Sequence, residues 1–377
     1  MLKHGIRLLG SDTDYAALLS HHLLDAADFQ PYRNRILAER KQAWIGRQSN
    51  KRPVPMDNFD PTLISVVMPC FNAATYVEEA IESVLQQTYP HVELIVVDDG
   101  STDGSTDILQ RLAADHPERI TLHFQTRSGP FAARNAALTH ANGNYIAFLD
   151  ADDTWNPDAL RLMHDALEAK QADVAYCGWQ NVGVAANDPN PQIPPILDLT
   201  KAAIHLLSHT PWPINSVLVR RHLIDELRGF SERAPTAMDY DLWLRMLARQ
   251  PRLVCVPEVL AFYRRYPRSS GHIPRWRQVF DAVAVRRDFV QHHPELVKQI
   301  PLARLNELIY DPLLREAYRC HWSNDTESAR RLFRRAFRKA DWNAGDFKHL
   351  VASLLPAPLY RNLVDLVTRR RSDRIEN

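Results

Sequence analysis

The chain has 377 residues, a formal net charge of +1 at pH 7, and contents of 45% hydrophobic and 24% charged residues. These values describe a globular protein with one large domain and extensions, or with two domains. The near-zero net charge gives no general case for nucleic-acid binding, and no run approaches the ~18 apolar residues of a membrane-spanning helix. The N-terminus shows no signal-peptide pattern, and the four cysteines have neither metal-site nor disulfide-framework spacing. We therefore expect a cytoplasmic protein that is soluble or lies on the inner face of a membrane.

Strand and helix patterns alternate along the middle of the chain. The expected strands cover 64–69, 94–98, 120–124, 145–149 and 174–177, and the expected helices cover 75–87, 131–138 and 159–167. This alternation indicates an α/β fold with a mostly parallel sheet flanked by helices. We predict a helical N-terminal extension with a linker over 1–60, an α/β domain over 61–272, and a helical, arginine-rich C-terminal region over 273–377.

Acidic residues follow the strand at 145–149. Asp150, Asp152 and Asp153 would repel one another unless a cation lies between them, and a hard divalent cation prefers oxygen ligands. Magnesium is commonly held by one or two carboxylates and shared with substrate phosphates, which points to a nucleotide-diphosphate donor. The alternative is that Asp153 or Thr154 caps the following helix.

Two earlier strands also end in polar turns. The strand at 64–69 is expected to stop at Pro69, which cannot donate to a sheet ladder. The strand at 94–98 ends in Asp98-Asp99-Gly100, where ordinary turn chemistry is the alternative interpretation of both acids. Ordinary turn chemistry could explain the polar residues after one strand. It explains less well why all three strands, at 64–69, 94–98 and 145–149, end in polar segments. Because ligands of open α/β sheets bind beyond the carboxyl ends of the strands, we expect the site there.

The segment 64–155 resembles the nucleotide-binding half of a family 2 glycosyltransferase with the GT-A fold. The resemblance rests on the order and spacing of V-V-M-P-C-F-N, V-V-D-D-G-S-T-D-G-S, G-P-F-A-A-R-N and F-L-D-A-D-D, which begin at Val66, Val96, Gly129 and Phe148. It implies a nucleotide-binding half over 61–175 and an acceptor half over 176–272.

Further motifs of this family lie downstream, with departures from its pattern. The run M-D-Y-D-L-W-L-R from Met238 is similar to the family's E-D-Y-D-L-W-L-R, with methionine in place of glutamate. Ala137 stands where the family often has glycine. Tyr263-Arg264-Arg265 with Ser269-Ser270 resembles the segment that closes the catalytic domain; the alternatives are a flexible lid and a plain basic loop.

The resemblance implies a role for each candidate site residue. Asp239 is the expected catalytic base, and Asp152 is the expected ligand of Mg²⁺ or Mn²⁺. Asp239 could instead only cap its helix, and Arg134 could be an ordinary surface arginine. The residues expected to bind the nucleotide-sugar are Pro69, Asn72, Asp98, Asp99, Arg134, Asp150 and Arg264.

The implied function is transfer of a sugar, with inversion, from a nucleotide-diphosphate sugar, UDP-sugar first, to an acceptor hydroxyl in polysaccharide, glycolipid or cell-envelope glycan synthesis. The acceptor is a glycan or a lipid-linked glycan, nucleic acid is not expected, and a homo-oligomer stays open. A nucleotidyltransferase is disfavoured because the first loop lacks the glycine- and arginine-rich sequence usual in that class. The alternative from another class is a non-catalytic nucleotide-sugar-binding or scaffold protein on the same fold.

The C-terminal tail has apolar residues at helical spacing, from Phe347 to Leu355 and again from Leu359 to Val367, and ends near Arg369-Arg370-Arg371. An amphipathic helix with a basic end can lie on an anionic membrane. The alternative is that these apolar stripes pack on the catalytic domain or on a second subunit.

Overall fold

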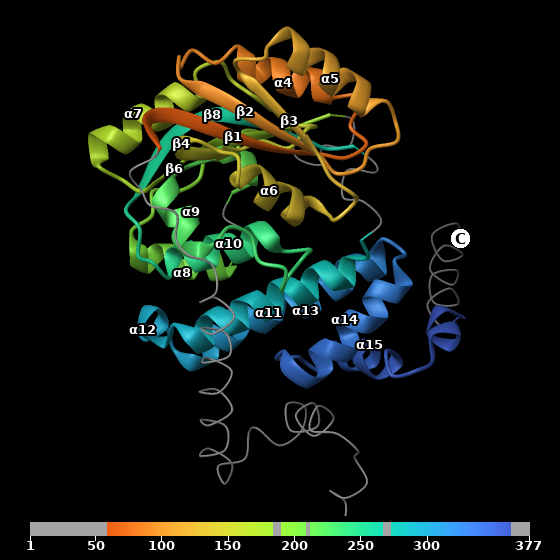
Figure 1. Cartoon of the computed structure of the whole chain (residues 1–377). Helices are drawn as coiled ribbons and strands as arrows, with labels where there is room; N and C mark the ends of the chain where they lie inside the picture. The colour runs from red at the N-terminus through yellow and green to blue at the C-terminus, as the bar shows by residue number, and fades with distance from the viewer. Residues whose placement is uncertain (1–58, 184–189, 209–211, 267–272, 363–377) are drawn as a thin grey trace, which may run out of the picture. The chain divides into compact units, whose positions relative to one another are not determined.

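The computed structural model describes residues 59–183, 190–208, 212–266 and 273–362 (Figure 1). The predicted extension at 1–60 lies almost entirely outside the described residues, as do Ser269, Ser270 and the basic end at 369–371. Among the described residues, no helix combines the length and the apolarity that crossing a bilayer requires.

The centre of the structure is an eight-stranded sheet with the order β3-β2-β1-β4-β7-β6-β8-β5. The first four strands in this order are parallel, β7 is antiparallel to both of its neighbours, and β6 and β8 are again parallel. The prediction of an α/β fold with a mostly parallel sheet is confirmed. The strand bounds are β1 Asp60–Cys70, β2 Val92–Asp98, β3 Ile120–Phe124, β4 Gly143–Phe148, β5 Thr154–Trp155, β6 Val174–Val182, β7 Val217–Arg220 and β8 Leu253–Arg264.

Helices cover both faces of the sheet because successive strand residues point to opposite sides. Val66 and Met68 of β1 pack with the face that carries α4, α5 and α7, whereas Val67 packs with the face that carries α6, α8, α9 and α10. Figure 1 shows α4 and α5 above the sheet and α6 and α10 below it. The bounds are α4 Val77–Leu85, α5 Ser105–Asp115, α6 Pro130–Leu138, α7 Ala159–Lys170, α8 Leu199–Ser208, α9 Arg221–Leu227 and α10 Met238–Leu247, with a 3-10 turn at Ile214–Ser216.

The structure contradicts the predicted alternatives in which Asp153, Thr154 or Asp239 caps a helix. Thr154 belongs to the short strand β5, and α7 begins after Asp158, so neither Asp153 nor Thr154 caps that helix. Helix α10 is preceded by Ala237 at its N-cap, which places Asp239 in the first turn. The side chain of Asp239 therefore does not cap the helix and is available for another role.

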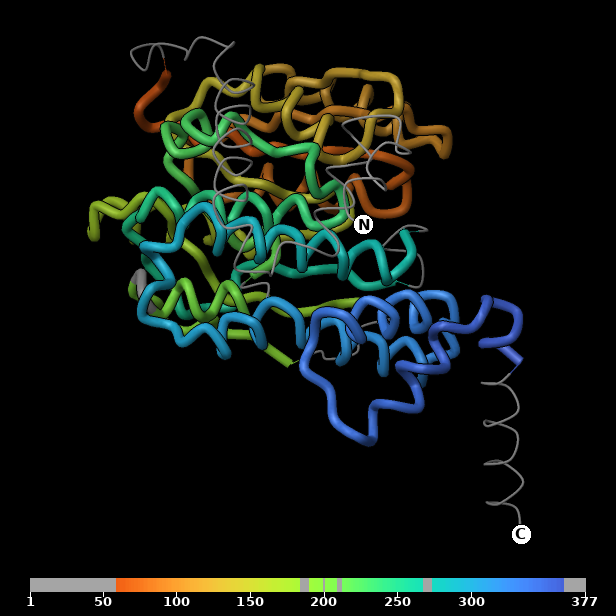
Figure 2. The backbone as a smooth tube through the Cα atoms, turned by 90° about the horizontal axis from the view of Figure 1, so that it is seen from below, coloured from red at the N-terminus to blue at the C-terminus, as the bar shows by residue number. Residues whose placement is uncertain are grey.

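The chain beyond β8 forms further helices with a core of their own, built around Leu313, Ala329, Leu332, Phe333 and Leu350. Figure 2 shows this region beside the α/β part, with the α14–α15 end farthest from the strands. The bounds are α11 Arg275–His292, α12 Pro294–Val297, α13 Leu302–Trp322, α14 Thr326–Lys339 and α15 Phe347–Ala352. Helix α15 divides the predicted apolar stripe, because Leu350 is fully buried whereas Phe347 and Val351 are exposed.

Candidate active site

The carboxyl ends of β1, β2 and β4 meet at one edge of the sheet. The backbone N–H of Asp99 donates to the carbonyl of Cys70 at 2.8 Å, and the N–H of Leu149 donates to the carbonyl of Val67 at 3.1 Å. Strand β1 ends at Cys70, one residue beyond the predicted stop at Pro69. These contacts bring the three polar strand ends together, as the sequence predicts.

Asp98 organises the turn that follows β2. Its Oδ1 accepts from the N–H of Ser101 at 2.9 Å, and its Oδ2 accepts from the hydroxyl of Thr106 at 2.6 Å. The turn interpretation therefore holds for this residue, while its contact with a nucleotide base stays a prediction. Asn72, at φ 51°, joins the same turn, because its Oδ1 accepts from the N–H of Thr102 at 2.8 Å.

Asp99 ties β2 to the start of α6 through four hydrogen bonds. One oxygen accepts from the side chain of Gln125 and the N–H of Ser128, both at 2.7 Å. The other accepts from the guanidinium of Arg127 at 2.8 Å and the N–H of Gly129 at 2.9 Å. The sequence did not identify Gln125 or Arg127, since neither belongs to a recognised motif.

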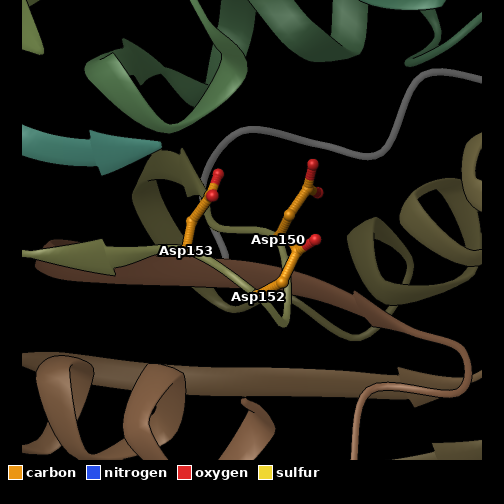
Figure 3. A group of neighbouring side chains, drawn as sticks. All are labelled: Asp150, Asp152 and Asp153. Atoms are coloured by element: carbon orange, nitrogen blue, oxygen red, sulfur yellow. The ribbon is translucent and has the colours of Figure 1, made fainter. Parts of the chain in front are cut away.

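Three carboxylates gather in the loop after β4. Oxygens of Asp150, Asp152 and Asp153 lie within 4.8 Å of one another, and Figure 3 shows the side chains pointing to the same side of the loop. Burial and the neighbouring carboxylate of Asp150 raise the pKa of Asp152 to about 6. Burial, with Asp152 and Asp150 nearby, also raises the pKa of Asp153. This edge of the sheet therefore holds a concentration of negative charge.

The three acids are held differently. Both oxygens of buried Asp153 are occupied, one by the N–H of Arg264 at 2.8 Å and the other by Nδ2 of Asn215 at 2.9 Å. Asp152 accepts at one oxygen from the hydroxyl of Tyr266 at 3.0 Å. Asp153 is thus a structural member of the cluster, while Asp150 and Asp152 each keep an oxygen with no hydrogen bond among the described residues.

Arg264 fixes this loop. Its Nε donates to the carbonyl of Asp152 at 2.8 Å, and its Nη2 pairs with Glu79 of α4 at 2.7 Å. The side chain also lies over the ring of Tyr76, 4.8 Å from its centroid. Among the alternatives from the sequence, these contacts favour an ordered support of the acidic loop over a plain basic loop.

Arg134 is buried between the two halves of the site. Its Nη2 pairs with Asp150 at 2.5 Å, and its Nη1 lies 3.7 Å from Oδ1 of Asp239. The same Nη1 lies 3.3 Å from the sulfur of Met238, the residue that replaces the family's glutamate. The surface-arginine alternative is wrong, since the side chain is 3% exposed.

Asp239 is a partly buried carboxylate with one buried oxygen that accepts no hydrogen bond among the described residues. Burial, opposed by Arg134 and reinforced by Asp150, raises the pKa of Asp239 to about 6. Its Oδ1 is buried without a hydrogen-bond partner in the described part of the chain. Asp241, two residues on, turns away from the site and is fully buried against Arg233 and Arg245. Only the first of these acids is available for chemistry.

The donor set at the β4 edge suits a hard divalent cation. All candidate ligands are carboxylate oxygens, which Mg²⁺ and Mn²⁺ prefer, and one oxygen from each of Asp150, Asp152 and Asp153 lies within 4.8 Å of the others. Asp153 has no oxygen left over. Asp152 and Asp150 are therefore the residues that could hold the ion.

Comparison with known proteins assigns the chain to a family. The profile described as glycosyl transferase family 2 matches residues 65–226. A Bacillus subtilis protein provisionally named as the teichuronic acid biosynthesis glycosyltransferase TuaG is 33% identical over 243 residues, which cover 63% of this chain and 92% of TuaG. The chain belongs to glycosyltransferase family 2. Another relative in B. subtilis, the uncharacterised glycosyltransferase EpsJ, is 30% identical over 223 residues, covering 56% of this chain and 64% of EpsJ.

Solved structures share the fold of this family 2 member. Residues 1–349 of Staphylococcus aureus TarS, in complex with UDP-GlcNAc, align with a TM-score of 0.55 and 19% identity over 82% of this chain and 92% of that one. The mannosyltransferase PcManGT of Pyrobaculum calidifontis, in complex with GDP-Man and Mn²⁺, aligns with a TM-score of 0.52 and 24% identity over 85% and 89%. The predicted GT-A fold is confirmed.

Proposed function

We propose that the chain is an inverting glycosyltransferase that moves a sugar from a nucleotide-diphosphate sugar, UDP-sugar first, to an acceptor hydroxyl. The observation that carries this proposal is the position of Arg134, in ion-pair contact with Asp150 on the donor side and Asp239 on α10. A donor held at the strand ends would lie next to a carboxylate able to accept a proton. The TarS complex with UDP-GlcNAc and the name of TuaG support a UDP-sugar and cell-envelope or polysaccharide synthesis.

The donor site is formed by the strand ends. Pro69 and Asn72 shape the first loop, where the nucleoside would rest, and Asp98 and Asp99 shape the second. Asp150 would contact the ribose, and Arg134 pairs with one of its oxygens. Arg264 acts by fixing the loop that carries Asp152.

Asp152, with Asp150 beside it, would hold Mg²⁺ or Mn²⁺. When bound, the cation supplies positive charge that stabilises the departing diphosphate. Asp239 would take the proton from the acceptor hydroxyl as that oxygen attacks the anomeric carbon. A pKa of about 6 leaves this carboxylate ionised near neutral pH and able to accept a proton. A single displacement of this kind inverts the anomeric centre.

The test measures nucleoside diphosphate released from a panel of UDP-, GDP- and dTDP-sugars, with Mg²⁺ or Mn²⁺ and with EDTA. We expect EDTA to abolish turnover. Asp152→Ala should also slow turnover strongly, because it removes several kcal/mol of transition-state stabilisation by the cation. Asp115→Ala, at an exposed position, is the matched control and should behave as the parent.

Three outcomes would contradict parts of the proposal. If neither EDTA nor Asp152→Ala changed the turnover rate, Asp152 would not hold a catalytic metal ion. Retention of the anomeric configuration, seen in the NMR spectrum of the product, would exclude a single displacement. Donor binding without turnover would favour the non-catalytic alternative.

A further inference from the structure

Helix α15 and the residues that follow it, up to Leu359, include several exposed apolar side chains. Phe347 and Val351 are 51% and 41% exposed, and Leu354 and Leu359 are 48% and 53% exposed. Because residues three and four apart share one side of a helix, the first three of these positions form a continuous stripe. Leu350, which borders this stripe one position before Val351, is fully buried in the helical core. The exposed stripe is therefore not needed to hold α15 in place.

Aromatic and further apolar side chains enlarge this stripe. The ring of Trp342, itself 42% exposed, lies 6.0 Å from that of Phe347, and Leu355 is 37% exposed. Contiguous exposed apolar groups mark interaction sites more often than scattered ones do. We define the α15 surface as Trp342, Phe347, Val351, Leu354, Leu355 and Leu359.

Positive charge surrounds the α15 surface. Arg330 donates to the carbonyl of Leu355 at 3.3 Å, and Arg334 donates to that of Leu354 at 3.1 Å, so both guanidinium groups lie beside the exposed leucines. Lys348 and Arg361 are exposed within the same segment. Residues 326–362 contain eight Lys and Arg against three Asp and Glu, although the whole chain has a net charge of only +1. The segment that carries the α15 surface is therefore net positive, and its basic residues within or beside the patch include Arg334, Lys348 and Arg361.

We propose that the α15 surface docks on an anionic lipid bilayer, with its apolar side chains at the headgroup boundary and its basic side chains against lipid phosphates. The charge pattern favours a bilayer over a second copy of the chain, because a two-fold interface would bring two basic surfaces together. Figures 1 and 2 show the α14–α15 end of the described chain away from the sheet. The inference does not depend on the transfer reaction.

Vesicle flotation of the full chain tests the proposal, with phosphatidylcholine alone and with phosphatidylcholine mixed with phosphatidylglycerol. We expect binding to the anionic vesicles at low salt, weakened by high salt. Leu354→Asp should weaken binding by at least about tenfold, since it removes an apolar contact and adds a repelled charge. Lys348→Gln should weaken it by about fivefold, the effect of one basic residue near the surface. The matched control is Leu302→Asp, at a 75% exposed leucine outside the α15 surface, which should bind as the parent does.

Tryptophan fluorescence gives a second readout that needs no charged substitution. The difference between the emission spectra of the parent and of Trp342→Phe reports on Trp342. This difference spectrum should shift to shorter wavelength when anionic vesicles are added. Absence of vesicle binding, equal binding to neutral vesicles, or unchanged binding of Leu354→Asp would overturn the proposal. Dissociation of an oligomer by Leu354→Asp, seen by light scattering, with no change in lipid binding, would assign the surface to a protein partner instead.

Discussion

The state of Asp239 depends on two neighbours with opposite effects. Arg134 favours its ionised form, whereas burial and Asp150 favour the neutral form, and the result is a pKa raised to about 6. A base with a pKa near the working pH combines the correct ionisation with useful basicity. Met238 contributes a thioether beside Arg134 where the family's glutamate would add a third carboxylate. The methionine therefore leaves Arg134 with only Asp150 and Asp239 as carboxylate partners among the described residues.

The pH dependence of transfer should reflect this carboxylate. Below about pH 6, Asp239 is protonated and cannot accept a proton, so we expect kcat/KM to fall at least about tenfold per pH unit, since the pKa of Asp152 is also raised to about 6. Asp239→Asn should lower kcat by about 10²- to 10⁴-fold while the Kd of the donor stays within about twofold. Steady-state kinetics and donor titration measure both quantities. A kcat/KM that does not change from pH 5 to pH 8, or an active Asp239→Asn, would exclude this residue as the base.

The same carboxylate should also affect stability. Because its pKa is raised in the folded protein, Asp239 contributes stability below its unfolded pKa near 3.8 and loses that contribution as the pH rises through about 6. Asp239→Asn should thus stabilise the protein by about 1 kcal/mol at pH 7, since a pKa difference of one unit is worth about 1.4 kcal/mol and solvent reaches part of the side chain. The gain should vanish below about pH 4, as thermal melts at the two pH values would show.

Single residues differ in how far the sequence identifies them. Asp150, Asp152 and Asp239 follow from local motifs, because each motif lies within one strand end or one helix turn. Tyr266 and Asn215 do not, since they reach the acidic loop across more than 60 residues of chain and have no periodicity of their own. The sequence placed Arg134 near the acids, but only the structure shows that it also reaches Asp239.

At the scale of elements, helix α11 supports the loop that leads into α10. The N–H and hydroxyl of Thr236 both donate to one oxygen of Asp281, at 3.2 and 2.7 Å. Arg233, in the same loop, pairs with buried Asp241 and lies 4.0 Å from Asp288 of α11. Helix α11 therefore helps to set the direction in which α10 presents Asp239.

Removal of one of these contacts should lower the rate of transfer without changing the affinity for the donor. Thr236→Val keeps the volume of the side chain and loses the hydroxyl donor, a hydrogen bond worth about 1 kcal/mol. We expect kcat to fall by about fivefold with an unchanged Kd for the donor, and Thr236→Ser to behave as the parent. Kinetics and donor titration of the three proteins make the comparison. Equal kcat for Thr236→Val and Thr236→Ser would show that this contact does not position the base.

Elements with strong periodicity were predicted correctly and short ones were not. The helices near 131–138 and 159–167 and the strand at 120–124 match α6, α7 and β3 closely. Strand β5 has two residues and exists only because Thr154 and Trp155 pair with Phe262 and Ala261 of β8. No local pattern predicts such a short strand, and the alternative that Asp153 or Thr154 caps the next helix was therefore wrong.

At the scale of the whole molecule, α15 has packed and exposed residues that its sequence pattern does not separate. One apolar stripe runs from Phe347 to Leu355, and hydrophobic periodicity alone does not separate the side that packs from the side that is exposed. The structure assigns Leu350 to the core with Leu332 and Phe333 of α14 and leaves Val351 outside it. Truncation at Asp346 would remove a buried core residue, so point substitutions are the better test of the surface.

Adjacent substitutions in α15 should separate the two sides. Leu350→Ala empties a fully buried position, and we expect it to lower the free energy of unfolding by about 2–4 kcal/mol. Val351→Ala changes an exposed position and should stay within about 0.5 kcal/mol of the parent. Urea unfolding followed by circular dichroism measures both differences. If Val351→Ala costs as much as Leu350→Ala in the isolated protein, another part of the protein or a second subunit covers the α15 surface in solution, and the surface is not free to meet a bilayer.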